Sequence, residues 1–385
     1  AQDPNSIDLA FALTFQGISA LMDWGDAPEV AGTAGYPTKA ASNGARHVLR
    51  GPWLGDATDQ PDAELDGLPE PQALGDDLSP TPAGDDEDGV AIPPLVRGQT
   101  NYVSFEVSLP ASGTGQAYVD GWIDFNGDKA WDATEQVVSG WYGPGVHTVA
   151  VTPPIAAVGT AASTFARVRI NSFGPLSPTG LARDGEVEDH EVQLVDLPEN
   201  VKWLQLPDLS TNGIDVRVDD LRIAADDFLC KETSLLTDVR LWGSWKQDEV
   251  GEIQNIHLSI HADDPVGPDG TSTANLFSQP EPQVLWSADF GTGEFKVQPY
   301  YRAPRPGEFW WDPQTGEWIP GGDQIVWQVD IAIDPREAFL QTGTPERPVI
   351  YWLDVRVTTE GGDFGWKTRQ WPDHFLDDAV WDYGS

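Results

Sequence analysis

Short runs of alternating apolar and polar residues follow one another along most of this chain, and Gly or Pro often separates them. A period of two places successive side chains on opposite faces, so each run predicts a β-strand. In the first half the runs cover residues 102–109, 117–125, 136–141, 146–151, 165–170 and 187–195. In the second half they cover residues 223–228, 237–242, 253–261, 283–286, 295–301, 325–333 and 349–357. Many short strands with turns between them predict an all-β protein.

Residues 1–20 carry the cleanest alternation and form an N-terminal extension. The apolar odd positions are Ile7, Leu9, Phe11, Leu13 and Phe15, and Gly17 ends the run. A strand of this kind pairs either within its own domain or with the sheet of a neighbouring subunit, as in donor-strand complementation. The second alternative predicts a homopolymer in which the chain is its own partner.

The remaining runs divide into two units, with a linker around residues 197–200. Residues 21–197 begin with a loop-rich acidic segment and continue into the first group of strands. Residues 201–385 form a second group that holds 12 of the 17 Trp residues. We expect two jelly-roll-like β-sandwich domains with long acidic loops.

The charge of the chain narrows the possible partners. There are 22 Lys and Arg against 62 Asp and Glu, which gives a formal net charge of −40. Such a polyanion repels nucleic acids and anionic lipids, and no apolar run is long enough to insert into a membrane. Because the acidic residues are clustered, bound divalent cations, chiefly Ca²⁺, are the expected counter-ions. Cys230 is the only cysteine, so no intramolecular disulfide can form, and we expect a buried thiol.

The most specific motif is the 12-residue segment 124–135. Its oxygen-bearing side chains occupy loop positions 1, 3, 5, 9 and 12, and position 7 offers a backbone carbonyl; this is the ligand spacing of an EF-hand calcium loop. The predicted ligands are Asp124, Asn126, Asp128, Ala130, Asp132 and Glu135. Position 6 is Lys129 rather than glycine, and the residues before the loop predict a strand rather than a helix. The competing interpretation is a solvated acidic turn.

Other carboxylates are less specific candidates. An acidic run is often only solvated, but carboxylates at this density favour bound cations. The further candidate calcium ligands are Asp85, Asp86, Glu87, Asp88, Asp76, Asp77 and Glu186.

Five motifs in a fixed order resemble those of the GEVED domain. They are DWGDAP (23–28), GARH (44–47), DDEDGV (85–90), GWIDFNGD (121–128) and GEVED (185–189). The resemblance covers about residues 22–196. It implies an extracellular β-sandwich module with calcium sites, of the kind found in secreted and surface proteins of bacteria and archaea, and no known catalytic residues. Residues 225–230 and 241–245 resemble an uncharacterised β-rich domain of similar secreted proteins.

No nucleophile elbow, phosphate loop or dinucleotide fingerprint is present, so we expect no enzyme. The Trp-rich second unit leaves carbohydrate binding and adhesion as the alternative function, with a polysaccharide as partner. The candidate stacking residues are Trp310, Trp311 and Trp371, and the competing interpretation is that they fill a core or an interface. Trp310 and Trp311 are adjacent, so on a strand one of them faces away from the core. The preferred hypothesis is a secreted, calcium-stabilised structural subunit of a surface filament, tubule or matrix.

Overall fold

The computed structural model describes residues 22–29, 35–58, 60–75, 89–111, 115–155, 163–197, 200–210, 212–265, 277–303, 307–369 and 378–383. Over these residues the protein is all-β, as predicted, and its helical segments are the short 3-10 helices η2 (Ala40–Ser42) and η3 (Lys246–Asp248). In the same residues no helix is long and apolar enough to cross a membrane. The predicted N-terminal strand (Ile7, Leu9, Phe11, Leu13 and Phe15), the acidic residues Asp76, Asp77, Asp85, Asp86, Glu87 and Asp88, and Trp371 lie outside the described residues.

The first half of the chain forms a β-sandwich. Its strands are β1 (Met22–Trp24), β2 (Arg46–Val48), β3 (Trp53–Leu54), β4 (Val90–Ala91), β5 (Leu95–Val96), β6 (Asn101–Ser108), β7 (Ala117–Ile123), β8 (Gln136–Tyr142), β9 (Gly145–Val151), β10 (Ser163–Asn171), β11 (Leu181–Ala182) and β12 (Glu186–Val195). One sheet has the order β5-β12-β10-β7-β8. In the other, β3 and β4 lie on one side of β6 and β9 on the other.

The core lies between these two sheets because every second residue of the main strands is apolar. Val119 and Ile123 of β7 and Val168 and Ile170 of β10 face Phe105 of β6, and all five are buried. The predicted alternation is therefore confirmed for these strands.

A third layer covers the outer face of the sheet that contains β10. It consists of the small sheet β1-β2-β11 and of described residues from the loop-rich segment, among them Ala27, Tyr36 and Ala73. Tyr36 of this layer packs on Trp131 and Phe165, with ring centroids 4.5 and 5.3 Å away. Both faces of β7 and β10 are consequently buried.

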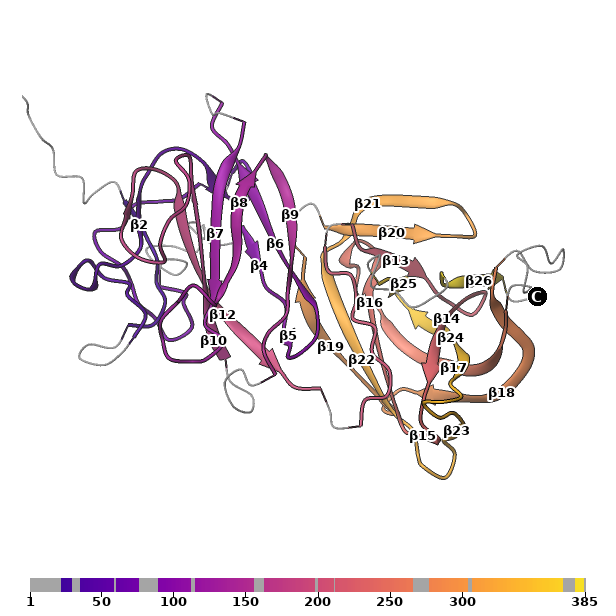
Figure 1. Ribbon diagram of the computed structural model, residues 1–385. Helices are drawn as coiled ribbons and strands as arrows, with labels where there is room; N and C mark the ends of the chain where they lie inside the picture. The colour runs from indigo at the N-terminus through magenta and orange to yellow at the C-terminus, as the bar shows by residue number, and fades with distance from the viewer. Residues whose placement is uncertain are drawn as a thin grey trace, which may run out of the picture.

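The second half forms another sandwich beside the first (Figure 1). Its strands are β13 (Ile214–Arg217), β14 (Arg222–Cys230), β15 (Ser234–Leu236), β16 (Asp238–Trp245), β17 (Glu252–Asp264), β18 (Gln279–Gly291), β19 (Phe295–Arg302), β20 (Glu308–Asp312), β21 (Glu317–Asp323), β22 (Ile325–Ala332), β23 (Phe339–Gln341), β24 (Val349–Glu360), β25 (Phe364–Lys367) and β26 (Val380–Tyr383). A seven-stranded sheet has the order β19-β22-β16-β25-β13-β20-β21, and a five-stranded sheet has the order β18-β17-β24-β14-β26. Strands β15 and β23 form a separate pair.

The core of this second sandwich contains Leu241, Leu258, Val329 and Val355. Cys230 is buried as a free thiol, as predicted.

A separate apolar cluster joins the two sandwiches. Val96 of β5 packs with Trp242 of β16 and Val326 of β22, and Leu206 and Leu209 of the connecting segment complete the cluster. We call these five residues the junction cluster.

Candidate metal centres

The 124–135 loop connects β7 to β8 and has its first and last carboxylates inside the protein. Asp124 is 0% exposed and Glu135 is 3% exposed. Asp124 Oδ1 accepts a hydrogen bond from Gly127 N at 2.6 Å, and Oδ2 accepts from Lys129 N at 3.0 Å. The Tyr36 hydroxyl donates to the same Oδ2 at 2.6 Å. Asp124, at the first loop position, therefore stabilises the turn and also links it to the outer layer through Tyr36.

The next candidate ligands each accept a hydrogen bond from the backbone two residues further on. Asn126 Oδ1 accepts from Asp128 N at 2.7 Å, and Asp128 Oδ1 accepts from Ala130 N at 2.9 Å. Asp132 Oδ1 accepts from Thr134 N at 2.7 Å. These consecutive side-chain turns fix the loop as a tight coil of alternating oxygen-bearing residues.

Glu135 closes the loop from its far end. Its two carboxylate oxygens accept hydrogen bonds from Asn126 N at 3.3 Å and Asp132 N at 3.1 Å. Burial raises the pKa of Glu135, and the negative charges of Asp124 and Asp132 raise it further. A cation among these oxygens would relieve that repulsion.

Lys129 replaces the glycine that the EF-hand pattern has at loop position 6, and its backbone is strained. Lys129 adopts a φ of +67°, in the left-handed region where a side chain is strained. The strain does not open the turn, because the backbone N–H of Lys129 still donates to Asp124.

Two glutamates at the start of β12 attach short strands of the opposite sheet. Glu186 Oε2 accepts a hydrogen bond from the backbone N–H of Leu54 in β3. Glu188 Oε2 accepts from Val90 N in β4 at 3.1 Å. Glu186 was predicted as a calcium ligand, but the acidic residues expected to act with it lie outside the described residues.

Asp189 points to the other face of β12 because side chains alternate along a strand. Its Oδ2 accepts a hydrogen bond from Ala27 N of the outer layer at 2.8 Å and pairs with Arg167 Nη2 at 2.6 Å. Both side chains of this ion pair are 0% exposed. The guanidinium also lies 4.3 Å from the ring centroid of Trp131 and donates to the carbonyl of Pro37.

His47 is a structural residue at the same interface. Arg169 Nε can only donate, so Nε2 of His47 accepts its hydrogen bond at 3.0 Å, and Nδ1 donates to Asp184 O at 2.7 Å. Burial lowers the pKa of His47 well below its usual value, in keeping with a neutral ring. Next to it, Gly185 has a φ of +96°, and a Cβ there would lie 1.7 Å from Ile170 O. Only glycine fits this position.

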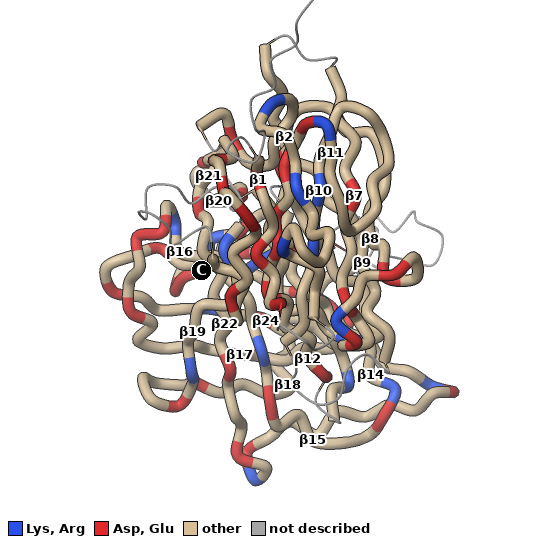
Figure 2. Tube along the Cα trace, turned by 90° about the vertical axis from the view of Figure 1, so that its left-hand side faces the viewer, with Lys and Arg blue, Asp and Glu red and all other residues tan. Residues whose placement is uncertain are grey.

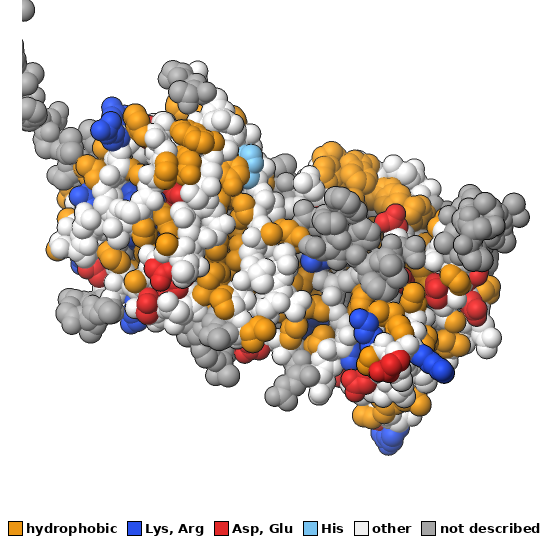
Figure 3. Space-filling model, in the orientation of Figure 1, with side chains coloured by type: hydrophobic (Ala, Val, Ile, Leu, Met, Phe, Trp, Pro, Cys, Tyr) orange, Lys and Arg blue, Asp and Glu red, His pale blue; other side chains and the backbone are white. Residues whose placement is uncertain are grey.

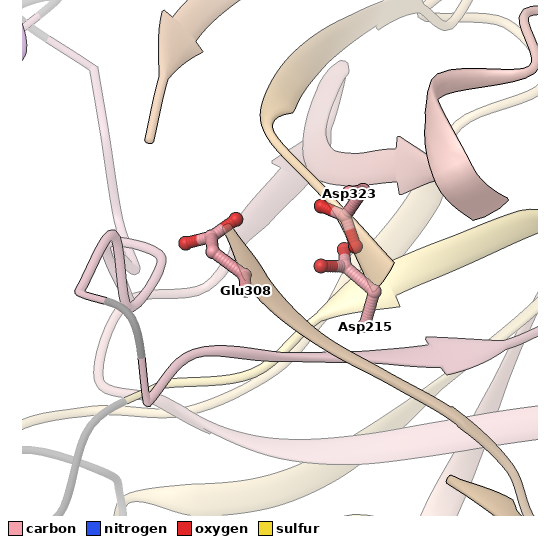
Figure 4. A group of neighbouring side chains, drawn as sticks. All are labelled: Asp215, Glu308 and Asp323. Atoms are coloured by element: carbon pink, nitrogen blue, oxygen red, sulfur yellow. The ribbon is translucent and has the colours of Figure 1, made fainter. Parts of the chain in front are cut away.

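A second acidic group lies in the C-terminal sandwich. Asp215 of β13, Glu308 of β20 and Asp323 of β21 each bring one oxygen to within 4.8 Å of the others (Figure 4). Their exposed fractions are 0%, 0% and 2%. Lys367 of β25 places its Nζ 2.7 Å from Asp215 Oδ2 and also contacts Glu308 Oε2. We call these four residues the buried acidic cluster.

Charge is not balanced in the buried acidic cluster. Three carboxylates and one ammonium would carry two negative charges if all were ionised. Burial raises the pKa of Glu308 well above its usual value and raises that of Asp323 to about 8, although Lys367 opposes both shifts. The Asp215 and Glu308 oxygens that do not contact Lys367, and those of Asp323, are hard ligands that could hold a divalent metal ion.

The candidate sugar-binding tryptophans separate as the strand pattern predicts. Trp310 is fully buried, which excludes it as a stacking surface for a sugar, whereas Trp311 faces outward and is half-buried. Trp311 packs edge-to-face on Trp381, with ring centroids 4.7 Å apart, and Phe309 lies 5.0 Å from Trp318. Figure 3 shows apolar side chains gathered over the β20–β21 hairpin.

The GEVED domain family matches residues 118–193, a range that runs from β7 into β12. The chain therefore contains a GEVED domain. A second family, described as a domain of unknown function (DUF7901), matches residues 201–383, which contain the second sandwich and the buried acidic cluster. No curated protein matches the chain.

The buried acidic cluster of this GEVED-domain protein was not predicted from the sequence. Its members are far apart in sequence and lie on strands that were not predicted. The one available signal is Asp215, a charged residue between two β-branched residues in β13. Such a residue is buried only when it is paired, so it indicates an internal charge partner.

Proposed function

We propose that this GEVED-domain protein is a calcium-stabilised structural subunit of an extracellular assembly. The observation that carries the proposal is the 124–135 loop, where two buried carboxylates close a tight coil of oxygen-bearing residues. A cation bound there would fasten the β7–β8 connection to the outer layer through Asp124 and Tyr36.

The protein's charge supports the same role for cations in both domains. Acidic residues are distributed along the whole trace, and basic ones are fewer (Figure 2). In the C-terminal sandwich, a Ca²⁺ ion in the buried acidic cluster would balance the two excess negative charges that the cluster carries when all three carboxylates are ionised. Calcium binding would thus contribute to the stability of each half of the chain.

The strained loop favours a location outside the cell. Calcium loops of extracellular modules bind at about 10⁻⁴–10⁻³ M, far more weakly than cytosolic sensors. A left-handed Lys129 is expected to weaken the 124–135 site toward that range. Millimolar calcium would still fill it.

Calcium is expected to raise the melting temperature by about 5–10 °C at a concentration of about 100 Kd, and a chelator should reverse the rise. Glu135→Gln keeps the size of the side chain but removes the charge at loop position 12, so it should lose most of this response. Glu191→Gln, on the exposed side of β12, is the matched control and should keep it. Differential scanning calorimetry with calcium and with chelator measures the shift, and identical curves for the unmodified protein would contradict the calcium proposal.

Carbohydrate binding is a second candidate because aromatic rings are exposed on the β20–β21 hairpin and on β26, whose Trp381 packs on Trp311. Trp318 is 47% exposed and Trp381 is 45% exposed, and Trp311 lies opposite Trp318 in the strand pair. Exposed rings in a row suit stacking on a polysaccharide.

If this surface binds glycans, Trp318→Ala should weaken retention on an immobilised polysaccharide by at least about tenfold, since one ring stack is removed. A glycan array followed by pull-down measures retention. Trp141→Ala, an exposed Trp of the first sandwich, is the control. Equal retention of both variants, or no glycan retained at all, would argue against the second candidate.

A further inference from the structure

A large groove opens between the two sheets of the C-terminal sandwich and extends along the connecting segment to Pro94, Val96 and Val195 of the first sandwich. It has a volume of about 1980 Å³ and is lined by half-buried apolar side chains, among them Phe228, Leu236, Leu353 and Trp366. Pockets for small molecules measure about 300–1,000 Å³, so this groove is large enough for a segment of polypeptide.

One wall of the groove contains an incomplete strand ladder. Strand β16 pairs with β22 from Asp238 to Ser244, but on its other side it pairs with β25 only from Gly243 to Trp245. Over the described residues, the edge from Asp238 to Trp242 therefore has no strand partner on the groove side. An open edge beside an apolar groove is the arrangement that β-strand addition uses.

We infer that residues 7–15 of a second copy of this chain add to that edge of β16 and fill the groove. The inference rests on the assembly proposed above and names its acceptor site. The alternation of this segment fits the groove, because its odd residues are large and apolar whereas its even residues are small or polar. Nine extended residues span about 30 Å, enough to cover the five-residue edge and continue along the groove.

Charge also favours this segment as the occupant. Copies that each carry a net charge of −40 repel one another, so a joint between them must bring few charges together. Residues 1–21 contain only two acidic residues, Asp3 and Asp8, and no Lys or Arg. The joint should therefore form more readily as salt screens the remaining surface.

The positions of the two ends favour a joint between copies. Strand β1, where the described chain begins, pairs with β2. Figures 1 and 2 place β2 at the end of the molecule opposite β14 and β15, which border the groove. A contact between these unlike ends is head-to-tail, and such contacts generate a filament when the rotation from one copy to the next does not close a ring.

Deletion of residues 1–17 tests the joint directly. Light scattering and negative-stain microscopy in calcium should show filaments of the full chain and folded monomers of the truncated chain. Phe11→Asp should also abolish assembly, because position 11 faces the groove, whereas Ala12→Asp should preserve it. Filaments of the truncated chain would overturn the inference while leaving the structural role intact.

A labelled peptide of residues 5–17 identifies the acceptor site. It should bind the truncated protein, and both Phe11→Asp in the peptide and Leu236→Lys in the protein should weaken binding by at least about tenfold. Leu285→Lys, at an exposed position of β18 away from the groove, is the control. Unchanged binding to Leu236→Lys, or no binding to either protein, would overturn the inference. If the peptide binds but the full chain stays monomeric, the joint between copies is wrong.

Discussion

Replacing Arg167 with methionine is expected to lower the free energy of unfolding of the GEVED domain by about 3–5 kcal/mol. Methionine retains much of the apolar stem but removes the guanidinium that pairs with Asp189 at 2.6 Å. Asp189 then remains as a buried charge without its ion-pair partner. The ring of Trp131 also loses the cation that lies 4.3 Å from its centroid. Urea denaturation followed by tryptophan fluorescence measures the loss.

Arg240→Met is the matched control for this measurement. Arg240 also pairs with an aspartate at 2.6 Å, but its side chain is 46% exposed. Exposed ion pairs contribute about 1 kcal/mol or less, so this variant should unfold close to the unmodified protein. If the two variants unfold at the same urea concentration, the buried ion pair does not hold the outer layer on the sheet.

Replacing Lys367 with methionine is expected to destabilise the C-terminal domain by about 3–5 kcal/mol near pH 9, and by less as the pH falls toward 5. Lys367 is the cation of the buried acidic cluster, so its loss leaves three buried carboxylates that repel one another. At lower pH these groups take up protons and the repulsion disappears. Thermal unfolding across this pH range measures the difference.

The direction of the pH effect follows from Asp323. Its pKa is raised to about 8, first by burial and then by the charge of Asp215. An acid with a raised pKa contributes stability that is fully present below its unfolded value of about 4 and is lost as the pH rises through 8. Lys296→Met, at an exposed position of β19, should show no such dependence. A pH-independent loss in Lys367→Met would mean that lost packing, not charge, destabilises the domain.

The long strands could be predicted from sequence because their apolar residues face a core. Strand β10 shows what a prediction from this apolar pattern leaves out. Its alternation predicted one apolar and one polar face, and the polar face with Arg167 and Arg169 would normally be solvated. The structure buries this face as well, because Asp189 of the neighbouring strand β12 and backbone carbonyls of the outer layer and of the β10–β11 loop satisfy the two guanidinium groups. The burial of Arg167 and Arg169 depends on contacts between segments that are far apart in the sequence. A local sequence pattern cannot predict such contacts.

The two candidate metal sites also differ in how far they could be predicted from the sequence. The 124–135 loop is local, so its spacing could be recognised, and the structure brings its first and last carboxylates inside the protein. The buried acidic cluster is not local, since Asp215 and Lys367 are 152 residues apart. In β20 the buried positions are Glu308, Trp310 and Asp312, so two of the three inward residues are charged. A prediction based on hydrophobicity alone would place such a strand at the surface.

The junction cluster has a mechanical consequence. Val96, Trp242 and Val326 come from both sandwiches, and Leu206 and Leu209 of the connecting segment are packed between them. Rotation of one sandwich against the other would pull these apolar side chains into water, so the cluster stiffens the protein against bending. In a head-to-tail fibre, curvature under tension would then concentrate at the points where one copy meets the next.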